Sequence, residues 1–509
     1  MKKSFKNTLI SIFLVLLMTA PSCLDLNEAP ENMVTPVNFY YTLGQCESVL
    51  ASCMNMLSSV WSGYNATPAW PAGQIEGGSF GYGANYQTGV WTRHWQCIAN
   101  VNPVIKSIKY DKIIGASQSA VDDMLGQAYF MRAWQYFWLV QLYGKLPWAA
   151  DDTPDLIAYP LTPESRLEVS VIYDKIEADL NEAFKLMDDY NTSRKARPCK
   201  WTAKALLAKV YLTRATAPVN DASCFAKAAA AADEVIKCGH YELLPIADIF
   251  MTSNPNNAEF IHAFQFTEDY PAMSGKAWGP EDDWDQWGLG RVSRLWAEKY
   301  PEQPRKNWYL RTSWPRNLEI DTADDPGEWD WIYYKNHPSD DAKDPWDGKK
   351  CWPNFTIQQQ FADGGNACVL LPIMRISEMY LIVAEADNLA NNGPTQRAVD
   401  YMNLIIDRAN EPFESVFDTW DEDIKYTSTQ GTEERASMAM SKEEFNEKVF
   451  LERQWELCFE FTAYFDLLRT RRLETWPPAS AIESFTPKDY LFPIPAFDAT
   501  IIGNNEGYE

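Results

Sequence analysis

The chain has 509 residues, long enough for one large domain or a few smaller ones with a substantial buried core. Hydrophobic residues make up 46% of it and charged residues 23%, a composition typical of a folded globular protein. The formal net charge of −25 argues against a nucleic-acid partner, because a polyanion would be repelled. The unusual feature is the aromatic content, which reaches 14% and includes 21 tryptophans. A proposed function should explain why so many tryptophans are present.

The N-terminus has the pattern of an export signal. Three lysines within the first six residues precede an apolar run over residues 9–20. That run is shorter than the about 20 residues that a membrane-spanning helix needs, but it suits a signal peptide. A cysteine placed directly after such a run is typical of a bacterial lipoprotein, in which the thiol carries lipid. We predict a lipoprotein signal peptide over residues 1–22, lipidation of Cys23 and an acidic tether over residues 23–40, with ordinary secretion as the alternative.

Cysteines and histidines give no support for a disulfide framework or a zinc site. Without Cys23 nine cysteines remain, an odd number, and no pair has CxxC spacing. The four histidines form no HExxH motif. Residues 281–285 and 339–348 carry enough acids to chelate calcium, but neither segment matches an EF-hand loop. We therefore expect no cofactor, and calcium at these acidic segments is the alternative.

Helical periodicity dominates the rest of the chain, so we predict a mostly α fold. Residues 125–147 are apolar nearly all round, which is typical of a buried helix, and Gly144 marks its end. Further helices are predicted over residues 168–187, 200–215, 224–239, 374–391, 395–410 and 441–461. The last of these opens with a capping box formed by Ser441 and Glu444. Consecutive helices with alanine at close-packing positions indicate tetratricopeptide-like hairpins.

Residues 265–366 differ from the helical segments in periodicity and composition. This segment shows few helical periods and is rich in Pro, Gly and Asp. Ten of the 21 tryptophans fall between Trp278 and Trp352. We predict a long, irregular, Trp-rich insertion on a helical scaffold, which is a place where function tends to be located.

Three glutamates, Glu452, Glu456 and Glu460, share one face of the last long helix, because they are spaced by four residues. Such a row of carboxylates is able to hold a metal or to perform acid–base chemistry. Four arginines lie near them in the sequence, at positions 453, 469, 471 and 472. We therefore predict a structural ion network in preference to a catalytic site.

Five segments match recurring patterns of one protein family. The strongest are DYLFPIPAFDATIIGNNEGY (residues 489–508), which resembles YL-PIP-E…QNPGY, and ERQWELCFEFTAYFDLLR (residues 452–469), which resembles ER-EL-EG-R--DL-R. In the second, Phe461 stands in place of the usual glycine and Ala463 in place of the usual arginine. The other segments are residues 90–102, 126–144 and 375–386. The family that these patterns resemble is SusD/RagB, lipoproteins of Bacteroidota that capture glycans or other nutrients at the cell surface.

The resemblance implies both a fold and a function. The fold is a scaffold of tetratricopeptide-like helical hairpins over residues 41–264, followed by a loop-rich C-terminal region over residues 265–509 that includes the Trp-rich insertion. The implied function is capture of a glycan at the outer membrane and its delivery to a SusC-like TonB-dependent transporter. The resemblance implies no catalysis.

The segment WGPEDDWDQW combines three tryptophans with four carboxylates. An indole covers the apolar face of a sugar ring, while neighbouring carboxylates accept hydrogen bonds from the sugar hydroxyls. We therefore predict glycan contacts from Trp278, Trp284, Trp287, Asp283 and Asp285. For Trp284 and Trp287 the alternative is packing of the loop on itself.

Four further residues complete the predicted glycan site, namely Trp331, Trp91, Trp95 and Asn102. Trp329 and Trp331 alternate as on a strand, so at most one of the two faces a ligand. Trp91 and Trp95 match the family pattern, but aromatic residues four apart are more often packed in a core. We assign Trp134, Trp138, Trp296, Trp308 and Trp455 to the core.

Other functions remain open at this point. A surface glycoside hydrolase also combines tryptophan platforms with paired carboxylates. No GxSxG elbow, P-loop or metal motif supports an enzyme, so we predict that the chain is not one. Some members of the resembled family take up peptides or other nutrients, and a scaffold subunit that binds only protein is a third possibility.

Overall fold

The computed structural model describes residues 39–61, 72–74, 84–110, 112–150, 161–190, 197–250, 254, 256–265, 292–311, 313–317, 329–333, 352–353, 371–417, 424–460, 462–480 and 485–507. The chain divides into two units, Met1–Phe39 and Tyr40–Glu509, and all the elements below belong to the second. The predicted signal peptide and Cys23 lie outside the described residues. Within those residues, no helix is both long and apolar enough to cross a membrane.

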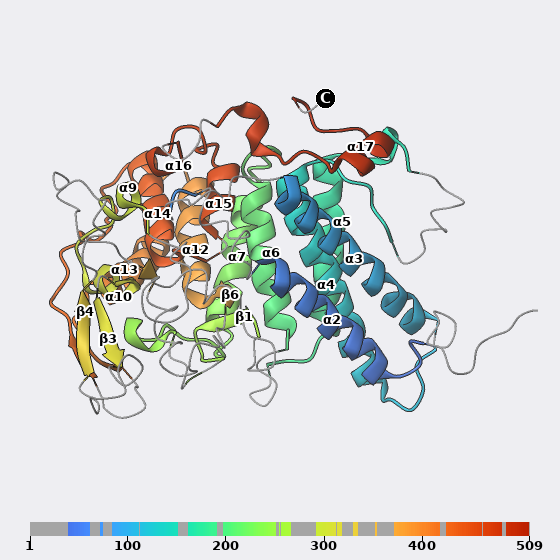
Figure 1. Ribbon diagram of the computed structural model, residues 1–509, viewed down its shortest axis with the longest axis horizontal. Coiled ribbons are helices and arrows are strands. Elements are labelled where there is room, and N and C mark those ends of the chain that lie inside the picture. The colour runs from blue at the N-terminus through green and yellow to red at the C-terminus, as the bar shows by residue number, and fades with distance from the viewer. Residues whose placement is uncertain are drawn as a thin grey trace, which may run out of the picture. The chain divides into compact units, whose positions relative to one another are not determined.

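Long helices form the N-terminal part of the second unit. They are α2 (Leu43–Trp61), α3 (Ala84–Lys109), α4 (Gln118–Tyr143), α5 (Val169–Leu186), α6 (Lys200–Arg214) and α7 (Cys224–Lys237). From α3 onward each helix packs against the next in the chain, as in consecutive hairpins (Figure 1). The predicted mostly α fold is therefore confirmed.

Helix α4 is the centre of this array. It contacts α2, α3, α5 and α6, and nearly all of its residues from Asp123 to its end are buried. The sequence predicts this, because its apolar residues occupy every face of the helix. Helix α4 ends at Gly144, whose positive φ of 70° is a conformation that favours glycine.

The C-terminal part is also helical where it packs against this array. It contains α12 (Ile376–Ala390), α13 (Gln396–Asn410), α14 (Lys442–Glu456), α15 (Thr462–Arg469) and α17 (Ala496–Ile502). Helix α12 joins the two parts, because it packs against α7 and α6 as well as against α13 and α14 (Figure 1). The antiparallel strands β1 (Phe260–Phe264) and β6 (Leu371–Arg375) pair beside it.

Short elements occupy the described residues of the Trp-rich insertion. They are α9 (Arg294–Ala297), α10 (Pro304–Tyr309), β2 (Leu310–Arg311), β3 (Ser313–Asn317), β4 (Trp329–Tyr333) and β5 (Trp352–Pro353). Strand β4 pairs with β3, so the strand predicted from the alternation of Trp329 and Trp331 is confirmed. Trp296 and Trp308 are fully buried, as are the helical tryptophans assigned to the core, which confirms that assignment. The remaining elements are β7 (Glu414–Phe417), β8 (Ile424–Thr427), α16 (Pro477–Ser480) and three short 3-10 turns.

The last long helix is shorter than predicted. Its capping box forms as expected, since Ser441 Oγ accepts from the Glu444 backbone N–H and Glu444 accepts from the Ser441 N–H. The helix ends at Glu456, however, and not at residue 461. There the Arg375 guanidinium takes the Glu456 carbonyl as its acceptor at 2.7 Å, and Phe459 adopts a positive φ of 61°. A buried side chain thus replaces the next helical hydrogen bond.

A cluster of buried ion pairs joins segments that are far apart in the sequence. The carboxylate of Glu456 on α14 accepts hydrogen bonds from Arg305 of α10 (2.6 Å), Arg375 of β6 (3.0 Å) and Arg408 of α13. Glu456 and its Arg305 and Arg375 partners have no exposed side-chain surface. The predicted structural network is confirmed, but its main cations come from three distant elements and not from the neighbouring arginines.

The neighbouring arginines form a second set of pairs. Arg453 and Arg469 both bind Asp466, each at 2.8 Å, and Arg469 also binds Glu385 at 2.5 Å. These groups are buried as well, so α12, α14 and α15 are tied together by charge. Arg472 instead pairs with the exposed Glu447.

The cluster around Glu456 has more carboxylates than guanidiniums. Its cations are Arg305, Arg375 and Arg408, whereas its anions are Glu259, Glu452, Glu456 and Glu460. Burial raises the pKa of Glu452 to about 7, and burial likewise raises the pKa of Glu460 to about 7. Burial acts on Glu456 in the same direction, but its three guanidinium partners outweigh it and hold the pKa of Glu456 well below its usual range.

We expect Glu452→Gln to change how stability depends on pH. The pKa of Glu452 rises from 4.5 to about 7 on folding, so this group favours the folded state below pH 4.5 and loses that contribution as the pH rises to 7. Glutamine does not titrate. The free energy of unfolding of the variant, minus that of wild type, should therefore rise by up to about 3 kcal/mol between pH 4.5 and pH 7. Urea denaturation of both proteins at pH 4.5 and 7.5 measures this difference. A difference that stays constant with pH would contradict the pKa assignment.

Candidate functional site

Most of the predicted glycan-contacting residues lie outside the described part of the chain. These are Trp278, Asp283, Trp284, Asp285 and Trp287. For Trp331 the structure describes the backbone, which pairs with Pro315 across the β3–β4 sheet. The prediction for these six residues therefore stays a prediction.

Trp91 and Asn102, by contrast, are engaged inside the fold. Trp91 on α3 is only 5% exposed, and its Nε1–H donates to Asp498 of α17 at 3.0 Å. The Asn102 amide donates to the Ala149 carbonyl at 3.0 Å and accepts from Arg132 at 3.0 Å. Both arrangements favour packing in the fold over contact with a ligand. For Trp91, core packing is the alternative that its four-residue spacing from Trp95 suggested.

Trp95 belongs to a half-buried aromatic cluster. It meets the edge of Tyr136 at 5.7 Å between ring centroids, and Tyr136 stacks on Trp148 at 4.0 Å. The cations of Arg132 and Lys175 lie 5.5 and 5.4 Å from the Trp148 ring. These contacts occupy the faces of Trp148 and stabilise the junction of α3, α4 and α5. Trp148 was not predicted from the sequence, although an indole just beyond a helix-ending glycine commonly packs on that helix.

The glutamate row, with Glu452 and Glu456 on α14 and Glu460 just beyond its end, is not accessible to a substrate in this arrangement. Glu452 and Glu456 have no exposed side-chain surface, and Glu460 is 8% exposed. Within the described residues, no group of three or more His, Cys, Asp or Glu side chains is placed to hold a metal. A substrate would have to displace several ion pairs to reach these carboxylates.

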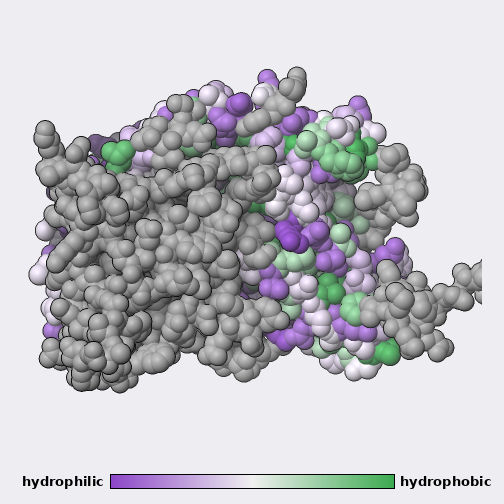
Figure 2. Space-filling view, viewed as in Figure 1, coloured by the Kyte–Doolittle hydropathy of each residue, from purple (hydrophilic) through white to green (hydrophobic). Residues whose placement is uncertain are grey.

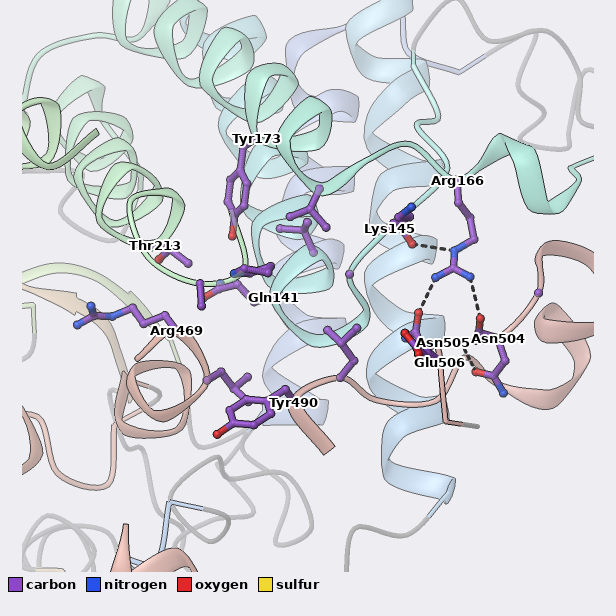
Figure 3. A pocket seen from close by; sticks show the side chains of 18 of the residues that line it. Gln141, Lys145, Arg166, Tyr173, Thr213, Arg469, Tyr490, Asn504, Asn505 and Glu506 are labelled. Atoms are coloured by element: carbon purple, nitrogen blue, oxygen red, sulfur yellow. Dashed lines mark hydrogen bonds between the residues drawn. The ribbon is translucent and has the colours of Figure 1, made fainter. Parts of the chain in front are cut away.

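A cavity of about 820 Å³ opens between the end of α4, the start of α5, α15 and the C-terminal segment. Figure 3 shows Gln141, Thr213 and Tyr173 across the cavity from Arg166, with Tyr490 below. Such a volume lies within the about 300–1,000 Å³ that is usual for small-molecule sites. Trp91, Trp95 and Asn102, the predicted glycan-contacting residues whose side chains the structure describes, do not line it. No local pattern indicates this cavity, because its walls come from stretches of chain that are far apart in the sequence.

The C-terminal segment closes one side of this cavity by a set of backbone bonds. The Phe492 N–H donates to the Leu142 carbonyl at 2.6 Å, next to Gly144. A Cβ at position 144 would lie 3.0 Å from Leu491, so glycine permits this close passage. Asn505 then donates to the Phe492 carbonyl at 2.8 Å, which closes the segment into a loop.

Arg166 clamps this loop to the N-terminal helices. Its Nε donates to the Lys145 carbonyl at 3.1 Å, its Nη1 to the Asn504 carbonyl at 3.1 Å, and its Nη2 to Asn505 Oδ1 at 2.5 Å (Figure 3). The asparagines of the C-terminal motif thus have a structural role. The C-terminal motif over residues 489–508, which gave the strongest family match, therefore holds the chain end against the N-terminal helices and forms one wall of the cavity.

An apolar surface lies over α17. Phe497 is 78% exposed and Ile501, one turn later, is 39% exposed. Figure 2 shows hydrophobic surface at the position that α17 occupies in Figure 1. Exposed aromatic residues on one helix face are common at protein–protein contacts.

Comparisons with known proteins agree with this architecture. A family model described as "Starch-binding associating with outer membrane" matches residues 37–212, and the model of the SusD family matches residues 265–495. SusD-like protein P2 of Formosa agariphila is 26% identical, over 97% of this chain and 99% of that protein.

Solved structures share the fold over almost the whole chain. A SusD superfamily protein of Parabacteroides distasonis is 22% identical and superimposes with a TM-score of 0.72, covering 91% of this chain and 99% of that one. A laminarin-binding SusD-like protein is 20% identical and gives a TM-score of 0.66 with the same coverage of both chains.

We expect Asn505→Ala to destabilise the fold. The substitution removes the donor to Phe492 and leaves one Arg166 N–H without its acceptor in a partly buried place, which costs about 1–3 kcal/mol. Asn181→Ala is the matched control, because Asn181 is exposed on α5 and its amide donates to the Glu177 carbonyl one turn before it. Its free energy of unfolding should stay within about 0.5 kcal/mol of wild type. Equal effects of the two substitutions in urea denaturation would contradict the clamp.

Proposed function

The chain belongs to the SusD family, and from that premise we propose that it is a cell-surface glycan-binding protein with no catalytic activity of its own. The observation that carries this proposal is the shared fold over 91% of the chain with a protein described as laminarin-binding. The Trp-rich segment supplies a second, independent argument. It offers indole faces and carboxylates in the combination that a sugar ring requires.

The expected affinity is modest. Covering on the order of 40 Å² of sugar by each indole contributes roughly 1 kcal/mol. Three or four such contacts and their polar partners, less the cost of ordering, give about −4 to −6 kcal/mol, which corresponds to dissociation constants from millimolar to tens of micromolar. Binding of this strength suits capture followed by release to a second protein.

We also propose where the protein acts and with which partner. A lipid on Cys23 would hold it at the outer membrane, facing the cell surface, where it delivers glycan to a SusC-like TonB-dependent transporter. Family membership supports this arrangement, and the exposed face of α17 offers apolar surface for a protein contact.

Two alternatives to glycan binding without catalysis can be tested by the product released or the ligand bound. A glycoside hydrolase would release reducing ends from polysaccharides incubated with purified protein. A peptide-binding member of the family would bind peptides and not laminarin or other glycans in a binding screen. The buried state of the α14 glutamates favours binding without hydrolysis.

We expect Trp284→Ala and Trp287→Ala each to weaken laminarin binding by about 1 kcal/mol or more, with little loss of stability, because a sugar-stacking indole lies on the surface. Trp455→Ala is the control: this indole is buried, so its loss should cost about 3–5 kcal/mol of stability. Calorimetric titration and thermal melting of the same three variants separate the two effects.

Unchanged laminarin affinity with a lowered melting temperature in the Trp284 and Trp287 variants would contradict the proposed site. Those tryptophans would then pack the loop on itself. An affinity loss confined to these two variants supports the stacking role.

We expect Cys23→Ala to release the protein from the outer membrane, because a lipid chain is the only attachment that we propose. Fractionation of cells that lack the transporter measures this, since a bound partner could retain the protein. A Cys23→Ala protein that still sediments with membranes in those cells would contradict the lipid anchor.

A further inference from the structure

The cavity beside the C-terminal clamp contains arginines that are not neutralised. The chain has 70 acidic and 45 basic residues, so a guanidinium without a carboxylate partner is unexpected. Arg469, which also lines the cavity, is paired with Glu385 and Asp466. Arg166 and Arg471 make no ion pair within the described residues.

Arg166 has donors to spare. A guanidinium carries five N–H donors, and Arg166 uses three of them, all on neutral oxygens. One N–H on each terminal nitrogen is left over. Burial lowers the pKa of Arg166, which shows that its charge is partly removed from water without compensation.

Arg471 is held differently. Its guanidinium carbon lies 4.3 Å from the centre of the Tyr490 ring, in a cation–π contact. None of its five N–H groups has a hydrogen-bond partner in the part of the chain that the structure describes. Arg471 is exposed, so its donors face solvent, and the ring holds its guanidinium at the edge of the cavity, where a ligand carboxylate would replace water.

The opposite wall offers uncharged polar groups. Gln141 on α4 donates to the Phe137 carbonyl at 2.8 Å, and its side-chain oxygen accepts no bond from the described residues. The Thr213 hydroxyl donates to the Lys209 carbonyl at 2.9 Å and keeps its lone pairs as acceptors. Both groups suit sugar hydroxyls, which donate and accept (Figure 3).

The remaining charges of the lining are at the exposed rim. Glu164 and Glu506 are exposed, and Lys145 pairs with Glu168 in a half-exposed contact. Solvent screens exposed charges, that of Arg471 included, so the proposed attraction depends on direct hydrogen bonds to the ligand and not on long-range charge.

We propose that this cavity binds a carboxylate-bearing sugar, a uronic acid residue, with its carboxylate at Arg471, in a lining that also holds Arg166, and its hydroxyls at Gln141 and Thr213. The site rests on the proposed function only in that its ligand is a sugar. It uses none of the tryptophans of the Trp-rich segment, so it is a second site on the same protein.

The test compares methyl β-D-glucuronide with methyl β-D-glucoside, which differ by the carboxylate, in calorimetric or NMR titrations of the purified protein. The glucuronide should bind about tenfold more tightly, because a charge-assisted hydrogen bond is roughly twice as strong as a neutral one. Arg471→Gln should remove this preference, Arg471→Lys should retain part of it, and added salt should weaken binding of the glucuronide alone.

Arg435→Gln is the matched control, because it removes the same charge from an exposed ion pair with Asp407 outside the cavity. It should leave glucuronide binding unchanged. Melting temperatures show whether each variant is folded. If Arg471→Gln does not fold, Gln141→Ala serves as the second cavity variant and should weaken glucuronide binding.

Equal affinity for the two glycosides would overturn the proposal, and so would an Arg471→Gln variant that binds the glucuronide as well as wild type does. An equal loss in Arg435→Gln would show attraction by overall charge and would also overturn it. Glucuronide binding that is lost in a Trp284→Ala, Trp287→Ala double variant but kept in Arg471→Gln would place the ligand elsewhere. A wild-type protein that binds the glucuronide but not laminarin, or whose laminarin affinity is unchanged in the Trp284→Ala and Trp287→Ala variants, would refute the proposed function at the tryptophans and leave this site standing.

Discussion

The structure depends on one buried carboxylate, that of Glu456. Three guanidiniums from α10, β6 and α13 converge on it, so the position of each of these elements is fixed by the same point on α14. Buried charges of this kind contribute little net stability, but removal of any one partner leaves another charge uncompensated and is strongly destabilising. The network therefore acts as a specificity device: it permits one arrangement of distant segments and penalises the others. Helix α14 ends where it does because Arg375 takes the carbonyl that the next turn would need.

Sequence periodicity predicted α4 to α7 and α12 to α14, but α2 and α3 were not predicted. Periodicity also failed where long-range contacts decide the structure. The buried helix that ends at Gly144 could be predicted, because its apolar residues and its stop signal are local. The arginine partners of the glutamate row could not, since Arg305 is separated by 151 positions from Glu456 and no local pattern links them. The same limit applies to the cavity. Arg166 and Asn505 are 339 positions apart, so neither residue alone indicates that they share a wall.

The family motifs take on a physical meaning in this fold. The C-terminal asparagines bond to the backbone of their own loop and to Arg166, so their recurrence follows from the geometry of closure and does not require contact with a ligand. Trp91 is explained in the same way by its bond to Asp498. Ligand choice would then be left to segments that the scaffold does not constrain, which is consistent with one fold serving proteins that differ in their ligands.

The clamp also affects the order in which parts of the protein fold, because it joins segments that are far apart in the sequence. The residues that close the cavity, from Phe492 to Asn505, are synthesised long after their partners at Leu142 and Arg166. The end of α4 and the start of α5 consequently lack these partners until the C-terminal segment has been synthesised. Contacts of such long sequence separation form late and slowly. A chain truncated near residue 490 would therefore retain most of its helices and still expose the surface that this segment covers, so proteolysis should distinguish it from the full-length protein.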